Sequence, residues 1–453
     1  MNILPVLDES FTPAVLVNRA FRKEVAGDGT RLVIGLKRNG DEFSRFETQV
    51  FPEGHPNFHR NFDYVERLVK FLLWQRGGFG VYIGGPQAIG QYIRQCYSPN
   101  GQRQFDYHFM SEQVYEQDFE VVCCSADEVP AARETGKLLG RYLKGHRIGF
   151  DLGASDRKVS AVVDGKVIYS EEVIWNPRSH ADPEYHYNEI MTALKTAASK
   201  MERVDAIGGS SAGIYIDNCP KVASLFRGIP KERFGEIRNL FTRIREELHV
   251  PLEVINDGDV TALAGSMSIE DNGILGIALG SSEAAGYVDM NGHITGWLNE
   301  LAFAPIDYSS GAPIEEWSGD VGCGASYFSQ QCVFRLASQA GIEIPSGLID
   351  ADKLKFVQEK LEAGHEGARA IWQSMGVYLG YGLAHYADFY DLKHVLILGR
   401  CTSGCGGDLL LGVATEVLRT EFPDLLEKIT LHLPDEKVRR VGQSVAAASL
   451  PVI

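Results

Sequence analysis

The spacing of apolar residues along the chain predicts alternating strands and helices, beginning with a hairpin. Residues 31–36 and 43–51 are rich in apolar side chains and flank a polar stretch that contains Asn39-Gly40, a pair typical of two-residue hairpin turns. In residues 62–75 the apolar positions instead follow the spacing of one helical face. Segments with one of these two patterns predict further strands at 81–83 and 119–124 and further helices at 89–97 and 131–143.

From about residue 147 the alternation becomes regular. Apolar runs of strand length occur at 204–211, 251–254, 273–280, 285–288 and 395–398. Helical patterns occur at 187–201, 234–248, 261–268 and 368–390, and another helix opens at Asp408. Strands that alternate with helices in this way are typical of α/β folds. We therefore expect an α/β fold.

The remaining motifs are arranged around residues 148–165. An apolar run meets Asp151, a tight turn follows at 153–155, and a second apolar run begins after Lys158 and ends at Asp164-Gly165. Such a hairpin places backbone N–H groups and a hydroxyl beside a carboxylate. The amides can bind phosphate oxygens while the carboxylate binds the accompanying cation. The alternative is an ordinary surface hairpin, in which Asp151 caps its own turn and Lys158 is solvated.

A similar shape recurs nearer the C-terminus. A second glycine-containing hairpin lies at 274–294, and the strand at 395–398 runs into a glycine loop. Between the hairpins, Asn256 and Asp257 follow a predicted strand. The repetition predicts two duplicated α/β lobes around a cleft that binds a polyphosphate, with Asp257 able to take a proton from an acceptor hydroxyl. A plain Asn-Asp turn at a strand end is the alternative for this pair.

The composition mainly excludes classes of protein, such as nucleic-acid-binding and membrane-spanning proteins. A chain of 453 residues is long enough for two or three domains. A net charge of −16 argues against nucleic acid as the main partner, because binding its phosphates requires a basic face. No apolar stretch is long enough to span a membrane, and the acidic N-terminus does not resemble a signal peptide. The eight cysteines are scattered and form no C-x-x-C pair, so we expect reduced thiols in the cytoplasm.

Six segments occur in a characteristic order: IGFDLGASDRK at 148–158, INDGDVTALAG at 255–265, LGIALGSSEAAGYVDMNGHITGW at 275–297, GWLNELAFAPID at 296–307, VLILGRCTSGCGGDLLL at 395–411 and VGQSVAAASL at 441–450. As a set they resemble the ROK family of sugar kinases, within the superfamily of actin, hexokinase and the heat-shock chaperone ATPases. In that family they correspond to the phosphate-1 motif, the Asn-Asp stretch, the phosphate-2 hairpin, the sugar-binding segment, the adenosine loop and the closing helix.

The resemblance implies a two-lobe actin-like ATPase (ribonuclease H-like) fold. The first lobe would comprise residues 146–262 and the second residues 263–453, with the C-terminal helix able to return to the first lobe. Residues 1–145 match no part of the family and would form an additional N-terminal α/β region.

The resemblance also implies an activity, which is transfer of the γ-phosphate of Mg-ATP to a hydroxyl of a sugar or sugar-like polyol by a homodimer. Asp257 falls on the general base, and Asp151 on the carboxylate that faces Mg²⁺. Substrate contacts are implied for Asn256, Glu300, Ser211 and Asn218. Nucleotide contacts are implied for Asp151, Gly153, Ser155, Lys158, Gly280, Ser281, Gly399 and Gly404.

The chain departs from the family at the sugar side. Phe303 stands where the family has a zinc-binding, sugar-contacting histidine, and only Cys323 of the zinc cysteines is present. Ala325 stands in place of a second sugar-binding glutamate, and Ser224 in place of an asparagine. Structural zinc is therefore not expected, and the identity of the sugar does not follow from the resemblance.

Glu283 lies in the phosphate-2 hairpin, where a negative side chain would repel ATP unless it points away. This departure motivates an alternative, a non-catalytic carbohydrate or nucleotide sensor that keeps the kinase fold. A third possibility is an ATPase of the same superfamily that drives another protein. His186, His293 and His365 lie alone on polar segments, and we expect them to be solvated.

Overall fold

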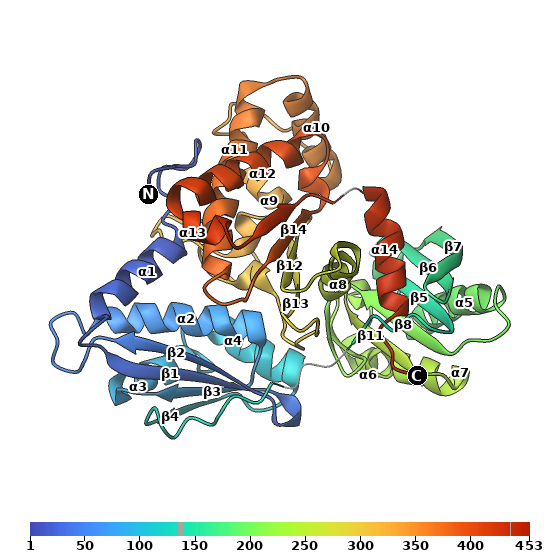
Figure 1. Ribbon diagram of the computed structural model, residues 1–453, viewed down its shortest axis with the longest axis horizontal. Coiled ribbons are helices and arrows are strands. Elements are labelled where there is room, and N and C mark those ends of the chain that lie inside the picture. The colour runs from blue at the N-terminus through green and yellow to red at the C-terminus, as the bar shows by residue number, and fades with distance from the viewer. Residues whose placement is uncertain (135–138, 154, 435) are drawn as a thin grey trace. The chain divides into compact units, whose positions relative to one another are not determined.

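The computed structural model describes residues 1–134, 139–153, 155–434 and 436–453. The chain forms two compact units, whose elements are labelled in Figure 1. Unit 1 comprises Met1–Thr135, Ile277–Ala285 and Gly296–Leu433, and unit 2 comprises Gly136–Gly276, Gly286–Thr295 and Pro434–Ile453. Each unit is therefore assembled from segments that lie far apart in the sequence.

A four-stranded sheet with the order β2-β1-β3-β4 forms the N-terminal part of unit 1. β1 (Thr30–Lys37) is antiparallel to β2 (Phe43–Val50) and to β3 (Gly80–Gly84), and β3 is parallel to β4 (Glu120–Cys124). The turn between β1 and β2 contains Gly40 at φ 67°, a left-handed conformation that glycine adopts readily. The hairpin predicted at Asn39-Gly40 is confirmed.

The helices of this N-terminal part are α1 (Ala14–Val25), α2 (Arg60–Arg76), α3 (Gln87–Cys96) and α4 (Gln104–His108). α2 is buried along most of its length, because the sheet packs against it and so do later segments of unit 1. Phe71 of α2 stacks on Phe389 with a ring separation of 4.0 Å, and the Gln75 side chain donates a hydrogen bond to the Phe389 carbonyl (3.0 Å). The N-terminal part is thus packed directly onto the rest of unit 1.

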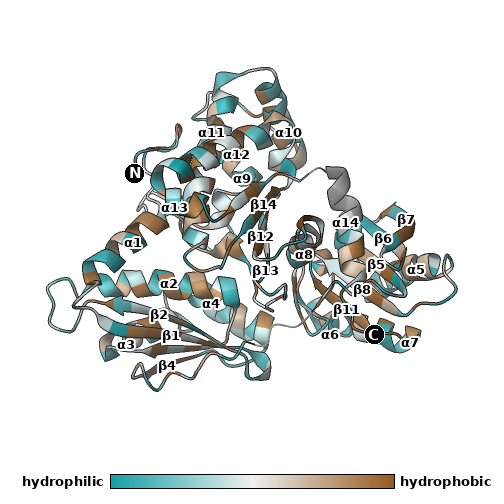
Figure 2. Ribbon diagram, in the orientation of Figure 1, coloured by the Kyte–Doolittle hydropathy of each residue, from teal (hydrophilic) through white to brown (hydrophobic). Residues whose placement is uncertain are grey.

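A second sheet has the order β13-β12-β14-β15. β12 (Ile274–Leu279) and β13 (Glu283–Val288) form a hairpin whose turn lies in unit 1, and β14 (His394–Leu398) is parallel to β15 (Thr430–His432). Figure 2 shows hydrophobic residues along β12 and β14, as expected for strands covered by helices. The helices of this part are α9 (Gln330–Ala337), α10 (Asp350–Glu362), α11 (Glu366–Tyr386), α12 (Cys405–Glu421) and α13 (Pro423–Leu426).

Glycines in α11 allow α12 to approach it closely. A Cβ atom at Gly376 would lie 2.6 Å from the Val413 Cβ atom, and one at Gly380 would lie 2.5 Å from that of Val417. A larger residue at either position would force the two helices apart. The mixture of small and aromatic residues in 368–390 therefore reflects a tight helix–helix contact.

Unit 2 is built on a five-stranded sheet with the order β11-β8-β5-β6-β7. β5 (His146–Leu152), β8 (Ala206–Ser211) and β11 (Leu252–Asn256) are parallel, while β6 (Asp156–Val163) is antiparallel to β5 and to β7 (Lys166–Ile174). Asp164 and Gly165 join β6 to β7 at φ 48° and 78°, so the hairpin predicted there is confirmed. A short hairpin, β9 (Ile214–Ile216) and β10 (Cys219–Val222), follows β8.

The helices of unit 2 are α5 (Pro183–Ala198), α6 (Phe234–Arg238), α7 (Leu240–Leu248), α8 (Asp257–Ile269) and α14 (Glu436–Ala448). α14 lies directly on the sheet, because β5 and β8 present glycines to it. A Cβ atom at Gly149 would lie 2.0 Å from the Ser444 carbonyl oxygen, and one at Gly208 would lie 1.7 Å from that of Ala447. Both strands are therefore covered by the C-terminal helix.

The five-stranded sheet and the sheet β13-β12-β14-β15 share one strand order. In unit 2 the hairpin β5–β6 continues through β8 to β11 on the β5 side, and the hairpin β12–β13 continues through β14 to β15 on the β12 side. The repeated shape predicted from the two hairpins is thus present in the strand order.

Two predictions are wrong. Residues 131–134 and 139–143 are not helical, and the rest of the predicted helix 131–143 lies outside the described residues. His186 is buried, and its ring nitrogens lie 3.3 and 3.1 Å from the carbonyl oxygens of Asp182 and Pro177, so it is not solvated. In the part of the chain that the structure describes, no helix is long and apolar enough to cross a membrane.

Candidate functional site

Asp151 lies near the end of β5 and is surrounded by groups from both neighbouring strands. The strand register places it beside Lys158 of β6 and Ser210 of β8. The Ser210 hydroxyl donates a hydrogen bond to Asp151 Oδ1 (2.8 Å), and Lys158 Nζ lies 3.8 Å from Oδ2. Burial raises the pKa of Asp151, while the serine hydroxyl and the lysine partly offset the rise.

The turn after Asp151 is closed by its own backbone. The Gly153 N–H donates to the Asp156 carbonyl (2.9 Å), and the Ser155 hydroxyl donates to Asp156 Oδ2 (3.1 Å). Ala154, at the tip of the predicted turn, lies outside the described residues. Lys158 Nζ lies 2.9 Å from Asp156 Oδ1, so this lysine is paired within the hairpin, and its contact with phosphate remains a prediction.

Asp257 is the first residue of α8, where the sequence predicted the end of a strand and a helix beginning at 261. Asn256 is the N-cap of α8, and its Oδ1 accepts a hydrogen bond from the Gly258 N–H (2.7 Å). Gly258 N–H also lies 3.0 Å from Asp257 Oδ1. A carboxylate in the first helical turn is favoured by the partial positive charge there. The strand-to-helix junction therefore fixes the direction in which Asp257 leaves the backbone.

Asp257 and Asp151 influence each other. Burial raises the pKa of Asp257 to about 6, and the negative charge of Asp151 adds to the rise. The Gly258 amide partly offsets both. A carboxyl with this pKa is ionised at neutral pH but accepts a proton more readily than an ordinary aspartate. Unit 2 thus carries two neighbouring carboxyls of different character.

The other residues expected to contact substrate in unit 2 already have internal partners. The Asn256 amide caps α8 and donates through Nδ2 to the Gly213 carbonyl (2.7 Å). The Ser211 hydroxyl is buried and lies 2.6 Å from the Tyr215 hydroxyl. Asn218 is bound to β11, where its Oδ1 accepts from the Val254 N–H (2.6 Å). These side chains shape the ends of β8 and β11, and their contact with a substrate remains a prediction.

Sequence reasoning missed Ser210 and Gln443. The Ser210 hydroxyl binds Asp151, and Gln443 Nε2 of α14 donates to Ser210 Oγ (3.3 Å). Ser210 and Ser211 are adjacent in a strand, so their side chains point to opposite faces. The sequence resemblance implied a substrate contact for Ser211 and said nothing of Ser210, whose contact with Asp151 follows from the strand register.

In unit 1, a short turn that contains Gly280 and Ser281 joins β12 to β13, and Ser281 is exposed. Gly280 N–H donates to the Ser282 carbonyl (3.1 Å), and a Cβ atom at Gly280 would meet nothing closer than 3.6 Å. Glu283, which follows the turn, points into the protein: it is 3% exposed and its Oε1 accepts from the Tyr386 hydroxyl (2.9 Å). Burial raises the pKa of Glu283 to about 8, partly offset by Tyr386. This carboxyl is therefore largely neutral at pH 7, so the expected repulsion of ATP does not apply to it.

The predicted adenosine loop joins β14 to α12. Gly399 has φ 103°, and a Cβ atom there would lie 2.4 Å from the Leu279 carbonyl oxygen, so only glycine fits. Gly404, at φ 64°, is the N-cap of α12. The carboxylate of Glu362, the last residue of α10, accepts a hydrogen bond from the Cys405 N–H (2.8 Å). The first amide of α12 is therefore bound by a side chain of the protein itself.

Glu300 precedes a short 3-10 turn at Leu301–Phe303. Its backbone N–H donates to the Trp74 carbonyl (3.0 Å). Phe303, which replaces the family's histidine, packs on Trp74 at a ring separation of 4.3 Å and on Phe105 at 5.9 Å. An aromatic cluster thus occupies the position at which the family would have a metal ligand. Among the described residues, no group of three or more His, Cys, Asp or Glu side chains is placed to hold a metal ion.

Of three comparisons with known proteins, only the comparison with solved structures found matches, and these inform on the fold alone. No family model matches this chain, and no curated protein matches it. Among solved structures, a ROK family transcriptional regulator described as a homologue of the E. coli MLC protein is 17% identical, covers 68% of this chain and 79% of its own, and has a TM-score of 0.52. A ROK family glucokinase from Streptomyces griseus is 20% identical over 67% of this chain and 99% of its own (TM-score 0.48). A ROK hexokinase from Thermus thermophilus is 17% identical over 67% and 97% (TM-score 0.49).

The likeness to the regulator shows a shared fold. The chain has the two-lobe actin-like ATPase fold, with an additional N-terminal α/β region, and the fold class predicted from the sequence is confirmed.

Proposed function

We propose that the protein is an ATP-dependent kinase that phosphorylates a hydroxyl of a sugar or sugar-like polyol. The observation that carries the proposal is the pair of carboxyls in unit 2, Asp151 and Asp257. A carboxyl whose only role was to cap a helix would gain stability from ionisation, and its pKa would fall. The pKa of Asp257 is instead raised to about 6, which suits a general base at neutral pH.

In the proposed reaction the two carboxyls have different roles. Asp257 takes the proton of the acceptor hydroxyl as its oxygen attacks the γ-phosphorus, and the bond between that phosphorus and the bridging oxygen of ADP breaks. Asp151 faces the magnesium ion that arrives with ATP, and Ser210 and Lys158 hold its side chain in place. Most of the rate enhancement in such transfers comes from positioning and charge neutralisation.

Residues of unit 1 complete the proposal. The loop of Gly399 and Gly404 receives the adenosine, the turn at Gly280 and Ser281 contacts phosphate, and Glu300 binds sugar hydroxyls. The neutral state of Glu283 supports a phosphate at that turn, because a buried charge there is absent at neutral pH. The cytoplasm and a homodimer remain the expected setting.

The test is an ADP-release assay with Mg-ATP and a panel of hexoses, amino sugars, pentoses and cyclitols. We expect turnover with one class of sugar, and loss of turnover in Asp257→Asn with nucleotide binding retained. Asp259→Asn is the matched control, because Asp259 is a buried carboxylate two residues later whose Oδ1 accepts from the Tyr287 N–H (3.2 Å). That variant should lower the melting temperature and keep turnover below it. Full activity of Asp257→Asn would refute the proposed base.

A non-catalytic carbohydrate-binding regulator is the second candidate. Two observations favour it: the solved structure with the TM-score of 0.52 is described as a transcriptional regulator, and Glu362 already binds the first amide of α12. Such a protein would show a thermal shift with a sugar in the absence of ATP and no ADP release with any member of the panel. The presence of the Asn256-Asp257 pair at the start of α8 argues against it, since a binding protein does not require a base.

A further inference from the structure

The segment that carries Glu300 is attached to the N-terminal part of unit 1 at several places. Its backbone at 306–308 pairs with residues 12–14, and two further attachments involve α2. The first is the end of α2, where the Asn299 N–H donates to the Gln75 carbonyl (2.9 Å) and the Glu300 N–H donates to the Trp74 carbonyl (3.0 Å). The last carbonyls of a helix have no donors within it. The main chain at Asn299 and Glu300 therefore supplies the missing donors, with Asn299 held at φ 51°.

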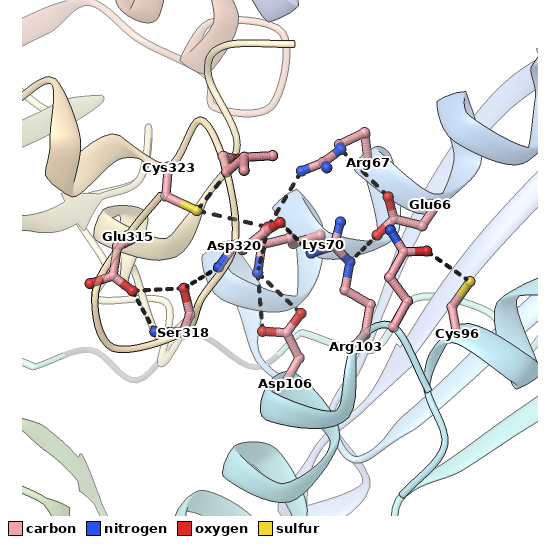
Figure 3. A network of polar contacts seen from close by, with 12 residues as sticks. Glu66, Arg67, Lys70, Cys96, Arg103, Asp106, Glu315, Ser318, Asp320 and Cys323 are labelled. Carbon is pink, nitrogen blue, oxygen red and sulfur yellow. Dashed lines mark hydrogen bonds and ion pairs between the residues drawn. The ribbon is translucent and has the colours of Figure 1, made fainter. Parts of the chain in front are cut away.

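The second attachment is Asp320, whose side chain is only 10% exposed. Figure 3 shows Arg67, Lys70 and Arg103 directed toward it. Arg103 Nη1 lies 2.7 Å from Oδ1, while Lys70 Nζ and Arg67 Nη1 lie 3.2 and 3.4 Å from Oδ2. Burial alone would raise the pKa of Asp320, but the three cations together hold it below its ordinary value. Asp320 is thus an ionised anchor in a buried setting.

Lys70 joins the two attachments. Its ammonium group is 1% exposed and lies 3.1 Å from both oxygens of Asp106 as well as beside Asp320. Asp106 Oδ1 also accepts a hydrogen bond from the Trp74 indole (2.9 Å). Trp74 lies four residues after Lys70 and therefore on the same face of α2. The residue whose carbonyl receives Glu300 is thus tied to the cluster that holds Asp320.

The chain between Asp320 and Glu300 is short and internally bonded. The Ile306 N–H donates to the Gly322 carbonyl (2.8 Å), which pairs the backbone after Asp320 with the backbone after Glu300. A displacement of Asp320 would therefore shift the backbone that follows Glu300, and a displacement of α2 would shift the backbone of Glu300 itself.

The cluster is balanced in charge. It contains three cations and three carboxylates: Arg67, Lys70 and Arg103 with Glu66, Asp106 and Asp320. Buried ion pairs add little net stability, but removing one partner leaves an uncompensated charge. We therefore expect this cluster to fix the relative positions of α2 and the segment around Asp320, and to contribute little to the free energy of unfolding.

We infer that Lys70 and Asp320 are positioning residues for Glu300, and that the N-terminal region serves to hold the sugar-binding segment in place. The inference rests on the proposed function, in which Glu300 binds sugar hydroxyls. It gives residues 1–134 a role on the substrate side of the reaction.

The test compares Asp320→Asn with Asp388→Asn. Asp388 is a matched control, because its side chain is 11% exposed and also receives two cations of the N-terminal part, Arg19 (2.7 Å) and Arg22, but it lies outside the Glu300 segment. The first readout is hydrogen–deuterium exchange of a peptide that contains residues 299 and 300. The second is the KM for D-glucose, D-mannose and N-acetyl-D-glucosamine, measured beside the KM for ATP.

We expect Asp320→Asn to speed exchange at residues 299 and 300 and to raise the sugar KM about tenfold or more, with kcat and the KM for ATP changed less than about twofold. Asp388→Asn should change both readouts less than Asp320→Asn does, because Asp388 pairs with Arg19 and Arg22, and it is its neighbours Phe389 and Tyr390 that meet Gln75 and Asn299. Equal effects of the two variants, or no effect of Asp320→Asn, would overturn the inference.

Two further arms keep the outcome interpretable. If Asp320→Asn does not fold, the variant Lys70→Met/Asp106→Asn removes one cation and one carboxylate together and should show the same faster exchange. If the wild type turns over no member of the panel of hexoses, amino sugars, pentoses and cyclitols, the proposed function is what fails, and the exchange readout still decides whether the cluster positions Glu300.

Discussion

Two hairpins of the same shape place an acid beside a glycine turn, and the structure treats the two acids differently. In β5–β6, Asp151 lies between a serine and a lysine on neighbouring strands and next to Asp257. In β12–β13, Glu283 is turned inward, where the Tyr386 hydroxyl donates to its Oε1 and its Oε2 has no hydrogen-bond partner among the described residues. The acid precedes the turn in the first hairpin and follows it in the second. The two acids thus lie in different settings, with polar partners on both neighbouring strands around Asp151 and a buried, more apolar environment around Glu283.

The difference follows from what surrounds each carboxyl. Ser210 and Lys158 favour the ionised form of Asp151 and partly offset its burial. Around Glu283 burial dominates, and the pKa rises to about 8. A Cβ atom at Gly324 would lie 2.0 Å from Glu283 Oε2, so the glycine makes the room that this carboxyl fills. The first acid therefore has partners that favour its ionised form, whereas the second is largely neutral at pH 7.

The largest expected effect is on turnover by Asp151→Asn. If this carboxylate faces Mg-ATP, its loss should lower kcat about 100-fold, because a neutral amide cannot compensate the cation. Glu283→Gln is the matched change on the other hairpin and should lower kcat less than about threefold. Sugar-dependent ADP release at pH 7.5 gives both numbers. Equal losses in the two variants would remove the distinction between the hairpins.

In the wild-type protein, the pH dependence of turnover should distinguish a carboxyl that acts in the reaction, Asp257, from one that does not, Glu283. Asp257 must be ionised to take a proton, and its pKa is about 6. The value of kcat/KM should therefore fall about tenfold for each pH unit below 6. Glu283, with a pKa of about 8, should produce no inflection near pH 8. An inflection near 8 that disappears in Glu283→Gln would assign that residue a part in the reaction.

The glycines around the second hairpin should differ in their tolerance of alanine. Gly399 combines φ 103° with a Cβ position 2.4 Å from the Leu279 carbonyl oxygen, so Gly399→Ala should lower the free energy of unfolding by about 2 kcal/mol or more. Gly280→Ala meets nothing closer than 3.6 Å and should change it by less than about 0.5 kcal/mol. Denaturant unfolding of the two variants measures the difference. A larger loss in Gly280→Ala would show that the turn, and not the approach of β14, requires glycine.

The sequence predicted the elements of this fold well where the pattern is local. Alternating apolar residues and Asn-Gly or Asp-Gly pairs identified the hairpins, because turn chemistry and strand period depend on neighbouring residues. The predicted helix at 131–143 failed because apolar spacing alone does not show whether a segment packs as a helix, and its described parts pair with Phe43 and Ser449 instead.

The candidate site was predicted less completely, for a physical reason. Asp151 and Asp257 could be named from the sequence, but their neighbours depend on strand register, which places Ser210 beside Asp151. The anchors of Glu300 come from residues more than 200 positions earlier, such as Trp74, and no local pattern reports such contacts. Burial likewise decided that Glu283 points inward.

The smallest expected effect is the contribution of Glu283 to stability, and its sign follows from proton uptake. The unfolded chain releases this proton near pH 4.5, whereas the folded protein keeps it to about pH 8. Folding is therefore favoured by this group at low pH, and stability is lost as pH rises through that window, by at most about 1.4 kcal/mol per pH unit. The raised pKa of Asp257 acts in the same direction, but only up to about pH 6. Melting temperatures measured between pH 6.5 and 8 therefore lie above the range of Asp257. Comparison with Glu283→Gln separates Glu283 from other groups that titrate there, such as His108, whose pKa is raised by its bond to Glu112. The decrease over this range should be smaller by a few degrees in Glu283→Gln than in the wild type. An equal decrease in both proteins would mean that Glu283 is already ionised in the fold, and the contrast between the two hairpins would then rest on geometry alone.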